Sequence, residues 1–119
     1  PRTYPRGLDT EVILFSALEK SWREDTDLAL REHVTQYIVQ NPELFTIAGF
    51  MHEQDNSSLR WTVDMQEDLD LITRIYTYFG NTAFSWRDVL DLVQKNPELT
   101  MINKHIQQKE IKQKQATHR

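Results

Sequence analysis

Apolar residues change their spacing at Asp64, and the change predicts a strand that leads directly into a helix. Upstream, Leu59, Trp61 and Val63 alternate with polar residues, which is typical of a half-buried strand. Downstream, apolar side chains recur at helical spacing, at Met65, Leu69, Ile72, Tyr76 and Phe79. Open α/β sheets bind ligands at the carboxyl ends of their strands, so the junction at Asp64 is a candidate functional site.

Two roles are open to the Asp64 carboxylate. As an N-cap, with Glu67 at the third helical position, it completes a capping box that contributes about 1 kcal/mol to helix stability. As a metal ligand, it supplies one of the few carboxylates that Mg²⁺ takes when phosphate oxygens supply the rest. A cap uses one carboxylate oxygen and leaves the other, so the two roles are compatible. Local physics alone favours the cap.

Periodicity and breaker residues predict further short strands and helices on both sides of this junction. The predicted strands cover residues 11–15, 44–51 and 59–64, the last two as an antiparallel hairpin with its turn at 55–58. The predicted helices run from Ser16, capped with Glu19, to about 25, from 28 to 40, from 64 to about 79, from Ser85 to about 95, and from 99 to about 108.

Helix ends are marked by residues that disfavour further helix. Gly80 predicts a left-handed helix end, and Ser85 predicts the next N-cap. In the helix after Ser85, the predicted core face consists of Val89, Leu90, Leu92 and Val93. The tetrapeptide Asn-Pro-Glu-Leu occurs twice, at 41–44 and 96–99, each time just after a predicted helix. A residue before Pro disfavours the helical conformation, so a reused helix stop explains the two copies better than an internal repeat.

Length, charge and composition exclude several classes of protein. The chain has 119 residues, enough for one domain, and its 14 basic and 18 acidic residues are mixed along the sequence, which argues against nucleic-acid binding. The absence of cysteine excludes disulfides and thiol chemistry and fits a reducing cytoplasm. No segment approaches the ~18 apolar residues of a membrane span. The chain starts without Met on a motif-rich loop, so we expect a fragment of a longer protein.

A second candidate group lies in the Pro-Arg-Gly loop and the segment after it: Arg2, Arg6, Gly7, Asp9 and Glu11. A Gly in such a loop lets the backbone approach a ligand closely. Asp9 and Glu11 share one side of an extended segment, where they can accept hydrogen bonds from sugar hydroxyls. Exposed charges that protect a sheet edge from aggregation are an equally good explanation.

A third candidate group is Arg31, Glu32, His33 and Thr35. Arg31 and Thr35 are one helical turn apart, and Glu32 and His33 flank that face, so the group suits an anionic sugar or a phosphate. A lone His in a helix is more often a surface or core residue, and this explanation stays open. The other histidines lack metal-ligand spacing, and neither a Gly-rich phosphate loop nor a Ser-His-Asp arrangement is visible.

Four segments of the chain carry a resemblance to a known family: residues 5–12, 31–38, 60–69 and 96–99. In order and spacing they resemble the C-terminal half of the spore coat polysaccharide biosynthesis cytidylyltransferases, relatives of the acylneuraminate and deoxyoctulosonate cytidylyltransferases. The resemblance implies the C-terminal part of a three-layer, Rossmann-like α/β fold, with a short mixed sheet and flanking helices, over residues 1–109. Residues 110–119 are expected to form a charged, frayed tail.

The resemblance also implies an activity. Such enzymes couple CTP to a sugar or sugar acid, release pyrophosphate and form a CMP-sugar for surface or spore coat polysaccharide. In this family the carboxylate that corresponds to Asp64 binds Mg²⁺. Where the family commonly has Thr-Pro or Ser-Pro after this Asp, the chain has Met65-Gln66, and Gln36 stands where a Pro is common. The missing Pro removes a preorganised first helical turn and leaves the carboxylate in place.

Together with the residue patterns above, this activity makes six residues the candidate substrate ligands: Arg6, Gly7, Asp9, Glu11, Arg31 and His33. Asp9 and Glu11 would orient the sugar, and Arg31 or His33 would bind an anionic group on it. The family's N-terminal half, with its triphosphate loop, base-recognition residues and first metal-binding Asp, has no counterpart in this chain. The isolated chain is therefore expected to be inactive, with Mg²⁺ shared with the missing half. The alternative is a non-catalytic interaction or dimerisation domain, forming a homodimer, that keeps the fold and uses its Trp and Tyr side chains as an exposed surface.

Overall fold

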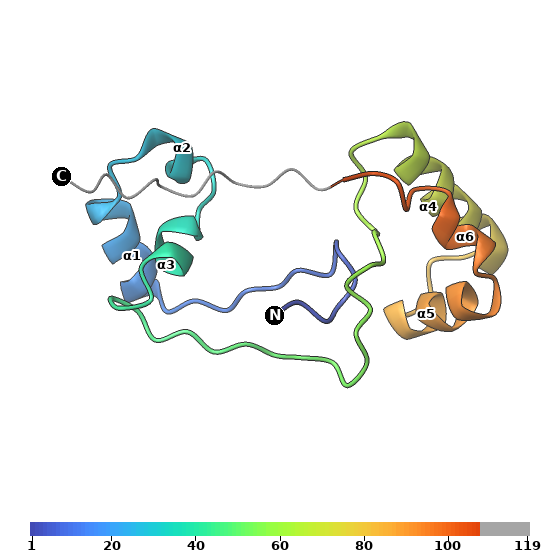
Figure 1. Cartoon of the computed structure of the whole chain (residues 1–119), viewed down its shortest axis with the longest axis horizontal. Coiled ribbons are helices and arrows are strands. Elements are labelled where there is room, and N and C mark those ends of the chain that lie inside the picture. Colours follow the sequence, from blue (N-terminus) through green and yellow to red (C-terminus); the bar gives the residue numbers. More distant parts are fainter. Residues whose placement is uncertain (108–119) are drawn as a thin grey trace. The chain divides into compact units, whose positions relative to one another are not determined.

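The structure, a computed structural model, describes residues 1–107, which contain six helices and no regular β-strand (Figure 1). These residues divide into two compact units, which we describe separately. The small unit is Thr10–Phe50. The large unit combines Pro1–Asp9 with the chain from Met51 onward. The chain thus leaves the large unit after its first nine residues and re-enters it later.

Three helices make up the regular structure of the small unit: α1 (Phe15–Glu24), α2 (Leu28–Arg31) and α3 (Gln36–Gln40) (Figure 1). The single helix predicted for residues 28–40 is therefore wrong, since the chain turns over residues 32–35. Val34 and Thr35 lie in this turn. Both are β-branched and lose side-chain freedom in a helix, so they favour a helix less than most residues do, although α3 itself includes Ile38 and Val39.

The segment that leads into α1 is not the strand predicted for residues 11–15. The chain is irregular up to Leu14, which is 76% exposed, and the described part of the unit offers no strand to pair with it. The Leu14 carbonyl accepts the N–H groups of Ala17 and Leu18, so α1 begins before Ser16 and the predicted Ser16 cap is wrong. A β-branched run forms a strand only where a neighbouring strand can pair with it.

The large unit is built around α4 (Gln66–Phe79), α5 (Trp86–Lys95) and α6 (Glu98–Met101) (Figure 1). Its core consists of buried apolar side chains from α4 and α5: Leu71, Ile75, Val89, Leu90, Leu92 and Val93. The four side chains from α5 are those predicted from the sequence. Burial of each such side chain contributes about 1.5–3 kcal/mol. Leu59 and Trp61 pack against this cluster from the preceding segment.

Among the described residues, β-type pairing is limited to one isolated parallel bridge, between Arg6 and Arg60. The Arg6 N–H bonds to the Leu59 carbonyl at 2.9 Å, and the Trp61 N–H bonds to the Arg6 carbonyl at 2.7 Å. The strand predicted for residues 44–51 and its hairpin do not form, and the predicted sheet is unconfirmed. Since Leu59 and Trp61 still pack on the helices, the alternating pattern identifies a half-buried segment without a strand ladder.

Helix ends in the large unit follow the predicted breaker residues. α4 ends at Gly80, whose φ of 68° lies in the left-handed region. α5 begins at the predicted cap Ser85, whose Oγ accepts the Asp88 N–H at 3.3 Å. Asp88 Oδ2 in turn accepts the Ser85 N–H at 2.7 Å. This reciprocal pair is a capping box, which satisfies two backbone donors at the helix start.

The two Asn-Pro-Glu-Leu segments act alike as helix stops. Asn41 Nδ2 donates to the Tyr37 carbonyl at 2.6 Å after α3, and Asn96 Nδ2 donates to the Leu92 carbonyl at 2.9 Å after α5. In each copy the Leu N–H then bonds back to the Asn carbonyl, at 2.9 and 3.0 Å. Because each Asn side chain bonds to a carbonyl in the last turn of the helix that it ends, the interpretation as a reused stop is confirmed.

α6 is shorter than the helix predicted for residues 99–108, because it ends at Met101 and turns follow. Residue 108 and the predicted tail at 110–119 lie outside the described residues. Within residues 1–107, none of the helices combines the length and the apolar character that crossing a bilayer requires.

Candidate functional site

The first turn of α4 holds the buried carboxylate of Asp68. Asp68 Oδ2 accepts the backbone N–H groups of Asp64 and Met65, each at 3.0 Å. The cap predicted for Asp64 and Glu67 is therefore wrong: the N-cap is Met65, and Asp68 is the carboxylate at the third helical position. The later start places Asp68 beside Arg60, whose buried charge requires a partner.

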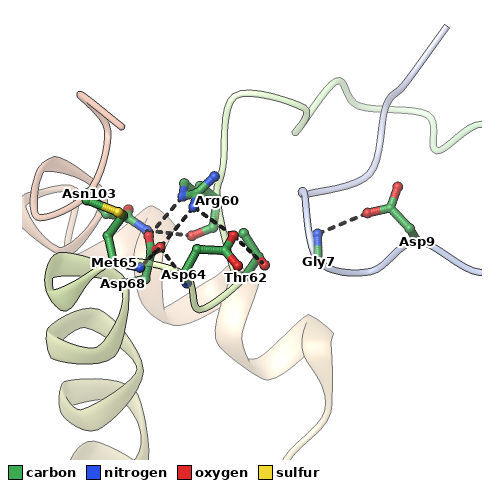
Figure 2. A network of polar contacts seen from close by, with 8 residues as sticks. All are labelled: Gly7, Asp9, Arg60, Thr62, Asp64, Met65, Asp68 and Asn103. Carbon is green, nitrogen blue, oxygen red and sulfur yellow. Dashed lines mark hydrogen bonds and ion pairs between the residues drawn. The ribbon is translucent and has the colours of Figure 1, made fainter. Parts of the chain in front are cut away.

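Asp68 is the centre of a buried polar network with Arg60 and Asn103 (Figure 2). Arg60 Nε lies 2.9 Å from Asp68 Oδ1, and Arg60 Nη2 lies 2.9 Å from Asp68 Oδ2, so the ion pair is bidentate. Asn103 Nδ2 donates to Asp68 Oδ1 at 2.8 Å and to the Arg60 carbonyl at 2.9 Å. The exposed fractions are 7% for Arg60, 0% for Asp68 and 2% for Asn103, so water does not compete for these bonds.

Arg60 and Asp68 stabilise each other's charged form. Hydrogen bonds from the Arg60 guanidinium hold the pKa of the Asp68 carboxyl far below its usual 3.8, although burial alone would raise it. Hydrogen bonds from Asn103 and from two backbone N–H groups lower that pKa further. In return, the hydrogen bond to Asp68 raises the pKa of Arg60. Both groups therefore stay charged at physiological pH.

Asp64 lies at the surface end of the same network (Figure 2). Its side chain is 63% exposed, and its Oδ2 atom lies 3.2 Å from Arg60 Nη2 and 3.5 Å from Thr62 Oγ1. Arg60 thus contacts both Asp64 and Asp68. Since Asp64 does not cap α4, its carboxylate is available to a ligand from solvent.

The donors around Asp64 suit Mg²⁺ only as part of a larger site. Asp64 offers an exposed carboxylate, and oxygen is the donor that Mg²⁺ prefers. Asp68 is fully buried, so it cannot be a second ligand. Residues 1–107 contain no group of three His, Asp or Glu side chains placed to hold a metal ion. A cation at Asp64 therefore needs further ligands, such as phosphate oxygens.

Gly7 and Asp9 form the tight loop predicted to approach a ligand. Gly7 has a φ of 105°, and a Cβ on it would lie 2.5 Å from the Trp61 carbonyl oxygen, so the close approach is to the chain itself. Asp9 Oδ2 accepts the Gly7 N–H at 3.2 Å, and Asp9 also pairs with Arg2. Partial burial acts to raise the pKa of Asp9, but the hydrogen bonds from Gly7 and Arg2 outweigh it and lower the pKa. Arg6 contributes its backbone to the β-bridge.

The other predicted sugar ligands lie in the small unit: Glu11, Arg31 and His33. The first segment of the large unit ends at Asp9, and the small unit begins at Thr10. Asp9 and Glu11, which were expected to share one side of an extended segment, therefore belong to different units. Glu11 is exposed, and His33 is exposed in the turn between α2 and α3. Neither unit by itself therefore contains all six of the predicted sugar ligands.

Arg31 has a structural role that the sequence did not indicate. Its Nη1 atom donates to the carbonyls of Trp22 and Asp25, each at 2.8 Å, and so caps the end of α1. The predicted helical face of Arg31 and Thr35 is wrong, because a turn separates the two residues.

Sequence reasoning missed Arg60, Asp68 and Asn103. The alternating pattern placed Arg60 on the polar face of a strand, yet Arg60 is buried. A signal for Asp68 existed, since a helix start at Met65 puts it at the third helical position, where capping carboxylates occur. Asn103 carries no local signal, because its partners are 35 and 43 residues away.

The chain shares its fold with part of a cytidylyltransferase of known structure. That protein, from Leptospira borgpetersenii serovar Hardjo-bovis, matches 92% of this chain with a TM-score of 0.79 and 30% identity, and the match covers 44% of its own length. The "Uncharacterized protein MJ1063" of Methanocaldococcus jannaschii is 33% identical over 109 residues, which are 90% of this chain and 45% of that protein. No protein-family model matches. The chain thus spans a little under half the length of the relatives it matches.

Proposed function

We propose that this chain is the sugar-binding and metal-completing part of a CTP-dependent cytidylyltransferase, which activates a sugar or sugar acid as a CMP-sugar in the cytoplasm. The likeness to a cytidylyltransferase over 92% of the chain supports the class of reaction. The sequence resemblance suggests surface or spore coat polysaccharide as the destination of the sugar. The remaining ligands of CTP are expected in residues outside this chain.

The exposed carboxylate of Asp64, held beside the buried Arg60–Asp68 pair, is the observation that carries this proposal. Attack on a nucleotide phosphate requires neutralisation of the charge that develops on the departing pyrophosphate. A bound Mg²⁺ supplies that positive charge. Asp64 provides one oxygen ligand for it, and the exposed Asp9 carboxylate in the loop next to Gly7 is the candidate acceptor for sugar hydroxyls.

Replacement of Asp64 by Asn tests the proposal in the full-length protein. We expect Asp64→Asn to lower the rate of pyrophosphate release from CTP and sugar by about 100-fold or more, because an amide is a poor Mg²⁺ ligand. Asp70→Asn is the matched control, since Asp70 is an exposed carboxylate on α4 that bonds to Gln66. A turnover close to wild type in Asp64→Asn, with an unchanged circular dichroism spectrum, would remove the metal role.

Exposed apolar side chains in the small unit favour a second candidate function, a non-catalytic interaction or dimerisation domain. Leu30 is its buried apolar side chain among the described residues, whereas Val12, Phe15, Trp22, Leu28, Val34 and Phe50 are 66–96% exposed. Phe15, Trp22 and Val34 line a groove of about 520 Å³. A second copy of the chain would cover such a surface.

Sedimentation of the full-length protein, with and without CTP and Mg²⁺, separates the two candidates. A stable dimer that neither binds CTP nor releases pyrophosphate would favour the interaction domain. CTP-dependent turnover that is lost in Asp64→Asn would favour the enzyme, whatever the oligomeric state.

A further inference from the structure

The Arg60 guanidinium lies between two carboxylates and contacts them unequally (Figure 2). Towards Asp68 it makes two bonds of 2.9 Å, from Nε and Nη2, to a carboxylate that is 0% exposed. Towards Asp64 it makes one bond of 3.2 Å, from Nη2, to a side chain that is 63% exposed. A bidentate buried pair is much stronger than a single contact at the surface. The positive charge of Arg60 is therefore neutralised mainly by Asp68.

Two carboxylates of the described network thus face the Arg60 guanidinium, and the exposed one is Asp64. Without the Asp68 carboxylate, the positive charge of Arg60 would act more strongly on Asp64, which it already contacts. It would then occupy the Asp64 oxygens and repel a dication from them. The Asp68 carboxylate is held in place by hydrogen bonds from Asn103 and from the N–H groups of Asp64 and Met65. The fold therefore fixes the geometry of its ion pair with Arg60.

We propose that Asp68 is a positioning residue for the cation site: by neutralising Arg60 it keeps the Asp64 carboxylate charged and open to a divalent cation. The inference rests on the proposed function, because it concerns the cation assigned there to Asp64. Asp68 itself touches neither the cation nor the substrate. Its contribution is electrostatic and acts through Arg60.

Binding of Mn²⁺ to the full-length protein in the presence of CTP, followed by electron paramagnetic resonance, tests the inference without turnover. Asp68→Asn keeps the shape of the side chain but removes its charge, and we expect it to weaken Mn²⁺ binding about 10- to 100-fold. Asp70→Asn is the matched control. It also removes one carboxylate charge from α4, but Asp70 is exposed and bonds to Gln66 outside this network, so we expect Mn²⁺ affinity close to wild type.

A double variant supplies the decisive comparison. Arg60→Gln combined with Asp68→Asn removes both charges at once, so nothing competes for Asp64 and Mn²⁺ affinity should return close to wild type. This comparison also holds if Asp68→Asn alone does not fold, with Asp64→Asn as the reference for a lost site. If the double variant binds Mn²⁺ as weakly as that reference, or if Asp68→Asn folds and binds as wild type does, the inference is overturned.

The metal role of Asp64 and the positioning role of Asp68 are contradicted by different results. If Asp64→Asn binds Mn²⁺ and CTP as the wild type does, the proposed metal role itself is wrong. If Asp64→Asn loses the cation while Asp68→Asn keeps it, only the role of Asp68 is wrong.

Discussion

Gly7 lies directly against the backbone of Trp61, so that a Cβ at Gly7 would approach the Trp61 carbonyl oxygen to 2.5 Å and its carbonyl carbon to 2.7 Å. The contact accompanies the bridge through which the N-terminal loop joins the segment before Asp64. The atoms against Gly7 belong to the backbone, so they cannot move aside as the end of a flexible side chain could. The position of the loop is therefore fixed.

The three glycines provide a graded test of this contact. Gly7→Ala should destabilise the protein by about 2–4 kcal/mol, because a positive φ and a backbone clash act together. Gly80→Ala should cost about 1 kcal/mol, since Gly80 has a φ of 68° but open space around it. Gly49→Ala should be neutral or slightly stabilising, because a Cβ added there would meet no atom within 4 Å beyond its chain neighbours. Urea unfolding of the three variants should reproduce this order, and equal effects at Gly7 and Gly49 would contradict the contact.

Removal of the Asp68 carboxylate should be among the most damaging changes to stability. Asp68→Ala leaves Arg60 buried without its bidentate partner and two N–H groups without an acceptor, so we expect a loss of about 3–5 kcal/mol. Asp91→Ala is the control. Asp91 pairs with Lys95 at 2.7 Å on an exposed helix surface, and its loss should cost less than about 1 kcal/mol. Urea midpoints at one pH measure both.

The acid sensitivity of the Arg60–Asp68 pair has a defined direction. The pKa of Asp68 is lower in the folded than in the unfolded chain, so its stabilisation is complete above the unfolded value of 3.8 and is lost as the pH falls through the folded value. The difference in unfolding free energy between wild type and Asp68→Asn should therefore stay constant from about pH 7 to about pH 5 and shrink below about pH 4. Carboxylates common to both proteins, such as Asp9 and Asp88, cancel in this difference. A difference that already shrinks near pH 6 would contradict the assignment.

Arg31 should affect the stability of α1 rather than sugar binding. Arg31→Ala leaves the carbonyls of Trp22 and Asp25 without their guanidinium donor, and we expect a loss of about 1 kcal/mol. Faster hydrogen exchange at the end of α1, with an unchanged KM for the sugar, is the expected result. Arg23→Ala, which breaks an exposed pair with Glu19, should change exchange less. A raised KM with normal exchange would return Arg31 to the substrate site.

Elements whose signals are local were predictable from the sequence. Ser85 and its apolar stripe identified the start and the buried face of α5, because a cap and a helical period depend on residues a few positions apart. The left-handed end at Gly80 and the two Asn-Pro stops follow from the same short-range sterics.

The errors arose where a residue's state depends on distant partners. Val12 and Leu14 have strand-forming neighbours in sequence but no strand to pair with in the described chain, so the predicted strand is irregular. Arg60 was assigned to the polar face, and only the carboxylate of Asp68 and the amide of Asn103 explain its burial. Of the candidate site, the sequence indicated Asp64 and not the network that holds it.

The interrupted course of the large unit has a consequence for the order of folding. Contacts such as that between the Asn56 N–H and the Thr3 carbonyl, at 2.8 Å, form only after the chain between them, residues 4–55, has closed into a loop. The contacts among α4, α5 and α6 require no such closure, so we expect them to form earlier. Pro1–Asp9 leaves the ribosome ahead of every other described segment, yet it makes its contacts with the rest of the large unit only when Met51 and the residues beyond it have been synthesised.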